Sequence, residues 1–519
     1  YMNIILADAS GTRASAADAP FEYGVDEQDV NTAHFYFYDA AGVFVSEAEV
    51  WNSGESSTED PDENIEFRAN TTVVLKGLTG KSYPKYLVTV LNKSTDFAPG
   101  TTLDEMEAKI AANDTEGNFK SGNYFTMSTT SHAGQKNSEG DAMKYFVTEV
   151  KKSNFSEEPV DLENYTAPVV VYVERLAAKV VLNVAEALKQ SATIVGEGDD
   201  AKTLYPIKAT YAGEGNDEEP TMGVEELYVN ILGWKLNATA KNSYMMKNID
   251  ETWTNEALGF VWNDGTINHR SYWGKSYVYG KSDFPVDGAA YTGEELLNYF
   301  NLENTTASPL LALGKPAYCA ENTNTSTIVT ANPRRALTSV IVKAEICDAA
   351  GNALDIVRYN GMLFNDVHFL KYVLNNMQKA GKLNAYYENG TEADGTTKKY
   401  KQIDENDVAL EDISDGKVKV VLNTTKTLTD AEGNALSEDA KAALADGMAD
   451  ASAGATGYKG GLMYYNIPIE HFNNNEIGED GAIPEAKYGV VRNHVYKVTI
   501  NQLENPGKGI FDPEEVIVP

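Results

Sequence analysis

The chain has 519 residues, which at roughly 100–200 residues per domain predicts two or more domains. Its 43 Lys and Arg residues against 77 Asp and Glu residues give a formal net charge of −34. Because phosphate groups are bound by cationic side chains, this charge argues against a nucleic-acid partner and against docking on anionic membranes. Hydrophobic residues make up 42% of the chain, so it is not an acidic disordered tail.

Cysteine content and hydropathy limit the protein class further. The two cysteines, Cys319 and Cys347, exclude a disulfide-dense scaffold, while one bridge and two buried thiols are both open alternatives. No apolar run approaches the roughly 20 residues that span a bilayer. The first 13 residues lack the basic start and long apolar centre of a signal peptide, which suggests a mature or truncated form.

Several segments are short, rich in β-branched or aromatic residues, and bounded by Gly, Asn, Asp or Pro clusters. This pattern is typical of an all-β sandwich and not of alternating strands and helices. In chain order the predicted strands cover residues 33–38, 71–75, 86–91, 168–173, 179–184, 227–232, 339–346, 417–422, 463–469 and 491–500.

The pattern Asp-Ala-x-Gly occurs three times, beginning at Asp39, Asp348 and Asp430. An Asp side chain can bond the backbone two residues further on, and Gly accepts the positive φ that ends such a turn. We therefore predict hairpin turns at these places; the alternative is a chance recurrence in a chain rich in Ala and Asp.

Few helices are predicted, and each is interpreted as a cover for the sandwich. Asn365 is placed to cap the best of them. Weaker helical signals lie at residues 294–300 and 437–448. The two stronger predictions rest on apolar residues at helical spacing: Leu103, Met106 and Ile110 in one, and Val367, Leu370, Leu374 and Met377 in the other.

The sequence offers no catalytic constellation. No two of the six histidines show metal-ligand spacing, and phosphate-binding and dinucleotide-binding loops are absent. Residues 274–278 approach a nucleophile elbow but lack its final Gly. Acidic clusters such as residues 217–219 could hold Ca²⁺, but without a calcium-loop pattern they are interpreted as solvated surface. A carboxylate pair for glycoside hydrolysis is defined by the distance between the two groups in the folded protein, so the sequence neither shows nor excludes one. We predict no catalytic residue, no cofactor and no metal.

An aromatic run at residues 270–279 could form a platform for sugar binding. Tyr and Trp side chains in an all-β protein more often complete the core, and we favour that interpretation. A change of composition near residue 174, where an acidic stretch and one strand precede a new strand, predicts a domain boundary.

Several segments together resemble one family, the Bacteroidales fimbrilins (type V pilins), and within it the short-fimbria major subunit. The order and spacing of these segments carry the resemblance, which spans most of the chain. They are Glu174 to Val184, Arg270 to Trp273, Tyr318 to Thr323 followed by Arg335 to Ile346, Tyr464 to Ile469 with His471, and Tyr488 to Ile500.

The resemblance implies two transthyretin-like β-sandwich domains with a few short covering helices. It divides the chain into an N-terminal pro-segment at 1–13, a domain at 14–173, and a domain with insertions at 174–519. It also implies export through the outer membrane as a lipoprotein precursor and trimming by an Arg-specific protease between Arg13 and Ala14. An ordinary exposed arginine is the alternative for Arg13, which lies among small residues in a segment typical of a nicked loop.

Polymerisation by strand exchange is the mechanism that we expect. Removal of the segment with Ile4, Ile5 and Leu6 would open a sheet edge, and an incoming strand would pair with that edge. The predicted donor is Val516, Ile517 and Val518 of a neighbouring subunit. Family members usually continue beyond this point, so either the donor segment is absent here or these residues begin it.

The predicted function is that of a structural subunit of a bacterial surface fimbria that supports adhesion. A tip adhesin or a surface glycan-binding lipoprotein of the same family is the alternative, with residues 355–448 as the expected place for a recognition insertion. An enzyme ranks last. The expected partners are identical subunits, fimbrial anchor and tip proteins, and host or bacterial surface receptors.

Overall fold

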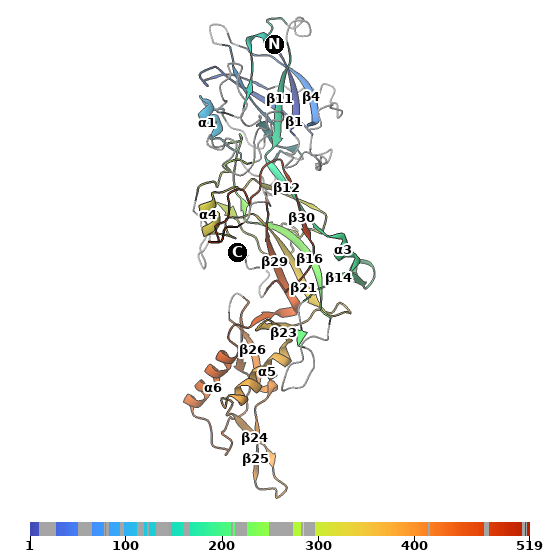
Figure 1. Ribbon diagram of the computed structural model, residues 1–519, viewed down its shortest axis with the longest axis vertical. Coiled ribbons are helices and arrows are strands. Elements are labelled where there is room, and N and C mark those ends of the chain that lie inside the picture. The colour runs from blue at the N-terminus through green and yellow to red at the C-terminus, as the bar shows by residue number, and fades with distance from the viewer. Residues whose placement is uncertain are drawn as a thin grey trace.

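The computed structural model describes residues 1–9, 27, 29–49, 65–76, 78, 83–93, 98–111, 119–121, 124–130, 145, 147–158, 167–208, 211–212, 226–248, 273–281, 284, 296–413, 416–471, 477–510, 514 and 516–518. Within these residues the protein consists mainly of β-strands joined by turns and short helices. The all-β prediction is confirmed. The molecule is elongated, with the first strands at one end (Figure 1).

An eight-stranded sheet forms the N-terminal end of the molecule. Its strand β2 contributes side chains to two cores, with Phe35 and Phe37 in one and Tyr36 and Tyr38 in the other. The strands follow the order β3 (Phe44–Glu49), β2 (Ala33–Tyr38), β5 (Tyr86–Leu91), β9 (Met127–Thr130), β11 (Val169–Arg175), β1 (Met2–Ala9) and β4 (Ile65–Val73), and β10 (Thr148–Glu149) pairs with β5.

Two further sheets face each other across a third core in the middle of the molecule. Strand β12 (Ala177–Val184) contributes Ala178, Val180 and Leu182 to this core, where they meet Trp234 and Val342. One sheet has the order β20 (Pro316–Ala320), β12 and β30 (Val495–Ile500). The other has the order β13 (Thr193–Val195), β14 (Lys202–Pro206), β16 (Tyr228–Asn237), β21 (Ser339–Cys347), β29 (Leu462–Pro468) and β31 (Lys508–Gly509).

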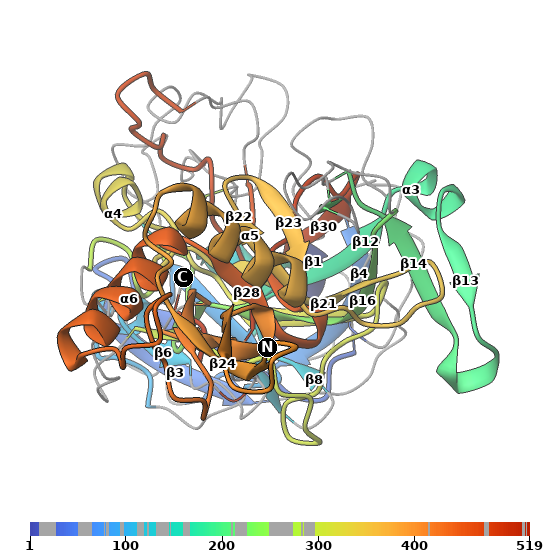
Figure 2. The same cartoon turned by 90° about the horizontal axis from the view of Figure 1, so that it is seen from below.

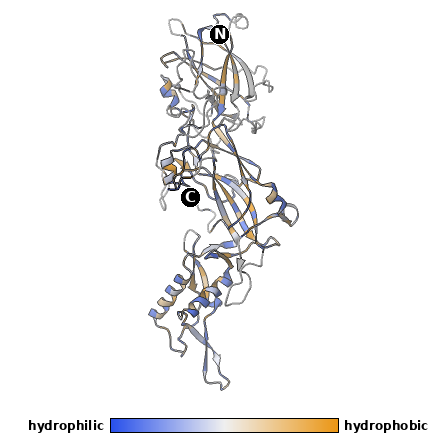
Figure 3. Cartoon of the chain, in the orientation of Figure 1, coloured by the Kyte–Doolittle hydropathy of each residue, from blue (hydrophilic) through white to orange (hydrophobic). Residues whose placement is uncertain are grey.

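A distal unit built from residues 355–458 lies at the end opposite to the N-terminal sheet (Figure 1). It has its own core, in which α5 (Asp366–Lys379) and α6 (Glu438–Ala451) pack on short strands. Both helices mix hydrophilic and hydrophobic residues, as helices with one buried face do (Figure 3). Its strands are β22 (Ile356–Tyr359), β23 (Met362–Asn365), β24 (Tyr386–Thr391), β25 (Lys398–Gln402), β26 (Val408–Asp412), β27 (Val418–Leu422) and β28 (Thr456–Tyr458).

The remaining described elements are short and connect these units. The helices are α1 (Leu103–Glu107), α3 (Glu186–Gln190) and α4 (Ser326–Ala331), with 3-10 turns η2 (Lys152–Asn154), η4 (Gly198–Asp200), η5 (Glu405–Asp407) and η6 (Lys459–Gly461). The strands are β6 (Ile110–Ala111), β7 (Lys120–Ser121), β8 (Tyr124–Phe125), β15 (Tyr211–Ala212), β17 (Thr239–Ala240), β18 (Ser243–Tyr244) and β19 (Leu297–Asn298).

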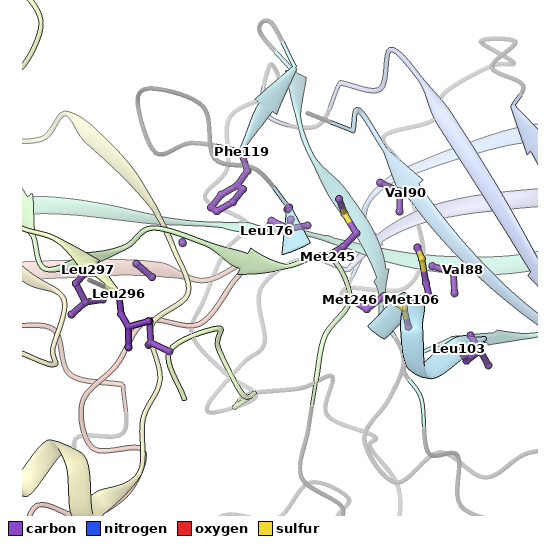
Figure 4. Packing of buried hydrophobic residues seen from close by; sticks show 14 of the residues in the cluster. Val88, Val90, Leu103, Met106, Phe119, Leu176, Met245, Met246, Leu296 and Leu297 are labelled. Atoms are coloured by element: carbon purple, nitrogen blue, oxygen red, sulfur yellow. The ribbon is translucent and has the colours of Figure 1, made fainter. Parts of the chain in front are cut away.

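The N-terminal and middle sheets are interlocked by a shared apolar cluster. Val88 and Val90 of β5 belong to the same cluster as Met245 and Met246, which follow β18 (Figure 4). Strand β18 also pairs with β6 of the N-terminal half. Seen from below, the distal unit is nearest the viewer, and β13 and β14 project to one side (Figure 2). The division into domains at residue 174 stays a prediction.

Each predicted strand overlaps an observed one, although the last begins at Val495 because the residues before it form a turn. The cap predicted at Asn365 is present, since its side chain accepts a hydrogen bond from the His368 amide at 2.8 Å. The helix predicted at 437–448 is observed as α6. The helix predicted from Leu103, Met106 and Ile110 is confirmed as α1, although Ile110 itself lies in β6, which pairs with β18. The helix predicted at 294–300 is wrong: its described part contains β19, because pairing with β17 overrides the local periodicity.

The three Asp-Ala-x-Gly turns are confirmed and share one hydrogen-bond pattern. In each, the Asp carboxylate accepts from the amides two and four residues on, at 2.8–3.0 Å. The glycines Gly42, Gly351 and Gly433 have φ values of 75°, 83° and 89°. The first turn joins β2 to β3 as a hairpin.

We predict that Asp348→Ala lowers the free energy of unfolding by about 1–3 kcal/mol, because two amides and the Asn352 side chain lose their acceptor. Urea denaturation measures the change. Asp348→Asn keeps the acceptor oxygen and is the matched control, which should stay within about 1 kcal/mol of the wild type. Equal losses in both variants would contradict this role.

Candidate strand-acceptor site

Strand β1 lies inside the N-terminal sheet, with a partner on each side. It pairs in parallel with β11, where Ile4 lies opposite Val169 and Asp8 opposite Val173. It pairs antiparallel with β4, from Met2 opposite Val73. Because both of its edges are used, its removal would leave two unpaired strand edges facing each other.

The inward-facing side chains of β1 fill part of the core. Met2, Ile4 and Leu6 are each 0% exposed and pack in the cluster that holds Phe35 and Val171. Full burial of an aliphatic side chain stabilises a fold by roughly 1.5–3 kcal/mol. The three side chains therefore make β1 a large contributor to the N-terminal core.

The structure confirms a strand at Ile4, Ile5 and Leu6, and this strand extends over Met2–Ala9. Arg13 and Ala14 lie outside the described residues. The exchange of this strand stays a prediction.

Val516, Ile517 and Val518 lie against their own chain and form no named strand. The Ile517 amide donates to the Phe300 carbonyl at 3.0 Å, and the Ile517 carbonyl accepts from Asn237 Nδ2 at 2.9 Å. Val518 packs on the apolar cluster shared by the two halves. In this conformation the predicted donor and the predicted acceptor do not meet.

Buried charges lie where the N-terminal and middle sheets meet, a feature that the linear sequence did not indicate. Arg492 and Glu321 are both 0% exposed, and Arg492 Nη2 lies 2.7 Å from Glu321 Oε1. Lys247 Nζ lies 3.9 Å from Glu174 Oε1. Burial works to raise the pKa of the Glu321 carboxyl, but Arg492 and Lys247 outweigh it and hold that pKa below its usual value.

Other sequence features have structural roles. Trp273 is fully buried, so the core interpretation of the aromatic run is confirmed at this residue, while residues 270–272 lie outside the described residues. Cys319 and Cys347 are buried free thiols, and burial raises both thiol pKa values to about 12.

Among the described residues there is no cluster of His, Cys, Asp and Glu suited to a metal. No described helix has the length and apolar character needed to cross a bilayer.

Residues 456–517 match the family model described as "Major fimbrial subunit protein type IV, Fimbrillin, C-terminal". The C-terminal segment of the chain is therefore that of a fimbrilin. It includes β29 and β30. The fimbrilin family consists of structural, non-enzymatic subunits, in agreement with the prediction of a non-enzymatic protein.

Solved structures give weaker likenesses to this chain. A fimbrilin from Porphyromonas gingivalis is 13% identical, with a TM-score of 0.32 over 99% of this chain and 93% of its own. A putative cell adhesion protein from Parabacteroides distasonis is 12% identical, with a TM-score of 0.31 over 99% and 96%. With TM-scores this low, the overlays carry no argument. No curated protein matches the chain.

We predict that Ile4→Ala lowers the free energy of unfolding by about 2–5 kcal/mol, because it leaves a cavity under β1. Chemical denaturation measures the loss. Ile194→Ala is the control, since Ile194 is 71% exposed and its truncation should change stability by about 0.5 kcal/mol or less. Similar effects at the two positions would contradict the packing of β1.

Stability should fall as the pH drops from 6.5 towards 4. Burial lowers the pKa of His494 to about 4, so the unfolded state binds a proton in this range before the folded state does. The slope contributed by this group approaches about 1.4 kcal/mol per pH unit. His494→Gln should lose that slope, and His368→Gln in the distal unit should keep it. Equal pH profiles for the wild type and His494→Gln would contradict the assignment.

Proposed function

We propose that this protein is a fimbrilin that polymerises by strand exchange at the β1 slot, which we define as the space between β11 and β4 that β1 fills. The position of β1 supports this most strongly: it is an inner strand with both edges paired and three fully buried side chains. An emptied slot would expose unpaired backbone and apolar core together, and a strand from another molecule would satisfy both.

A cut at Arg13 would sever β1 from the rest of the chain. The segment that leads into β2 has contacts of its own that do not depend on β1. Arg13 lies just beyond the end of β1 at Ala9. Further on, the Asn92 side chain bonds the backbone of Asp29, Asn31 and Thr32 at 2.7–3.1 Å. The entry to β2 therefore keeps its position when β1 becomes a separate peptide.

The donor in this proposal begins with Val516, Ile517 and Val518 of the next subunit. Two hydrogen bonds, to the Phe300 carbonyl and from the Asn237 side chain, hold it in its own chain, together with the packing of Ile517 and Val518 on apolar clusters. The slot would offer the same segment backbone pairing and apolar burial in place of these contacts. Head-to-tail repetition of such an exchange gives an open filament and not a closed ring.

The same proposal includes export of a lipoprotein precursor through the outer membrane and association with anchor and tip proteins of the fimbria. Surface receptors on host or bacterial cells are the proposed adhesion targets. The distal unit favours a second candidate, a tip or glycan-binding protein, because it has a separate core at the end remote from β1. Such a unit is suited to recognition when it lies at a filament end.

We predict that an Arg-specific protease converts the full chain into SDS-resistant ladders whose subunits begin at Ala14. Gel electrophoresis and N-terminal sequencing measure both events. Arg13→Ala should remain monomeric, and Arg334→Ala, which removes an exposed arginine elsewhere, should still form ladders. A chain that is cut after Arg13 and loses β1 yet stays monomeric at high concentration would contradict the proposal.

A further inference from the structure

Strands β1 and β30 lie end to end along one continuous strand. β11 leads into β12 through the single residue Leu176. β1 pairs in parallel with β11 as far as Asp8 opposite Val173, and β30 pairs in parallel with β12 from Val495 opposite Lys179. Figure 1 shows β1 beside β11 and, further down, β30 beside β12. Between these partners lies a gap opposite residues 174–178.

The directions of the amides show that both partners use the same edge. Successive amides of a strand point to opposite edges. The Leu176 amide donates to the Thr126 carbonyl, next to β9, at 3.0 Å, so the Arg175 amide points to the other edge, where β1 lies. Lys179, four residues further on, donates its amide to the His494 carbonyl at 2.9 Å, which places β30 on the same edge as β1.

Asn493 occupies the gap. Its side-chain oxygen accepts from the Arg175 backbone amide at 3.2 Å and from Arg175 Nη1 at 3.0 Å. The backbone amide of Asn493 donates to the Ala177 carbonyl at 3.1 Å. Its φ of 58° is a left-handed conformation that Asn tolerates better than most residues. The Asn493 oxygen therefore takes the place that a carbonyl of a longer neighbouring strand would need.

Glu27 binds the same arginine from the segment that follows the proposed cleavage site. Its backbone carbonyl accepts from Arg175 Nε at 2.8 Å, and its carboxylate lies 3.0 Å from Lys179 Nζ. The Tyr318 hydroxyl also donates to this carboxylate. The side chains of Glu27 and Lys179 are each 12% exposed, so this contact is largely shielded from solvent and is stronger than a surface ion pair.

We propose that Arg175, Asn493 and Glu27 form an end stop that fixes the length and register of any strand that fills the β1 slot. This inference rests on the proposed function, in which that strand is exchanged. The slot then takes a segment about as long as the eight-residue β1, with three apolar side chains at alternate positions in place of Met2, Ile4 and Leu6. A longer strand gains no further pairing along β12.

Peptide binding to the full chain, cleaved after Arg13 and freed of its severed segment, tests the stop. One peptide carries residues 1–9, and a second adds Val-Thr after Ala9. The wild type should bind both within about twofold. Asn493→Gly keeps the backbone turn but removes the side-chain oxygen to which the Arg175 amide donates. This variant should bind the longer peptide about two- to tenfold more tightly than the shorter one, as expected for one added hydrogen bond.

Asn360→Gly is the matched control, because Asn360 also has a positive φ, of 48°, and lies in the turn between β22 and β23. It should behave as the wild type does. A wild type that already prefers the longer peptide, or an Asn493→Gly variant without preference, would overturn the stop. If neither peptide binds any of the three proteins, the proposed function fails instead.

Hydrogen exchange tests the same inference without a substitution. When the slot of the cleaved wild-type chain is emptied, the Val171 and Val173 amides, which face β1, should exchange much faster. The Arg175 amide should stay protected, because Asn493 and not β1 is its partner. Exchange at Arg175 as fast as at Val173 would overturn the end stop.

Discussion

The whole fold depends on one nearly continuous strand, β11 followed by β12, which belongs to the N-terminal sheet on one side of Leu176 and to a middle sheet on the other. Its valines and leucines supply both cores. Because such a strand must be paired along its length, each segment of its edges needs a partner. Along one edge those partners are β1, the Asn493 side chain and β30, and β1 is the partner that a cut near Arg13 would detach.

The junction around Leu176 is stiffened by buried polar and charged groups. Arg492 bonds Glu321, Ser243 and two backbone carbonyls, and Arg175 bonds Asn493 and Glu27. Burial of charges costs free energy, and it is tolerated where hydrogen bonds satisfy nearly every donor. Since these groups come from segments far apart in the chain, they couple the N-terminal and middle sheets, so the emptying of the β1 slot need not unfold the rest.

Under the proposed strand exchange a subunit must be rigid and must also accept a strand from its neighbour, and the two demands fall on different parts of this molecule. Rigidity comes from the interlocked cores around Met245 and Met246 and from the junction charges. The exchange that we propose involves only the strand that contains Ile4 and Leu6. The distal unit, with its separate core of α5, α6 and short strands, adds length without contributing to the slot.

The sequence by itself determined the all-β class, the positions of most strands, the Asp-x-x-Gly turns and the helix capped by Asn365, because these depend on residues within one turn or strand. It also indicated the strand at Ile4 to Leu6. The tertiary structure alone decided that β1 is an inner strand, that residues 297–298 pair as a strand, and that Asn493 meets Arg175 across 318 positions of sequence. Strand order and buried charge pairs are set by contacts between distant segments, and local propensity carries no record of them.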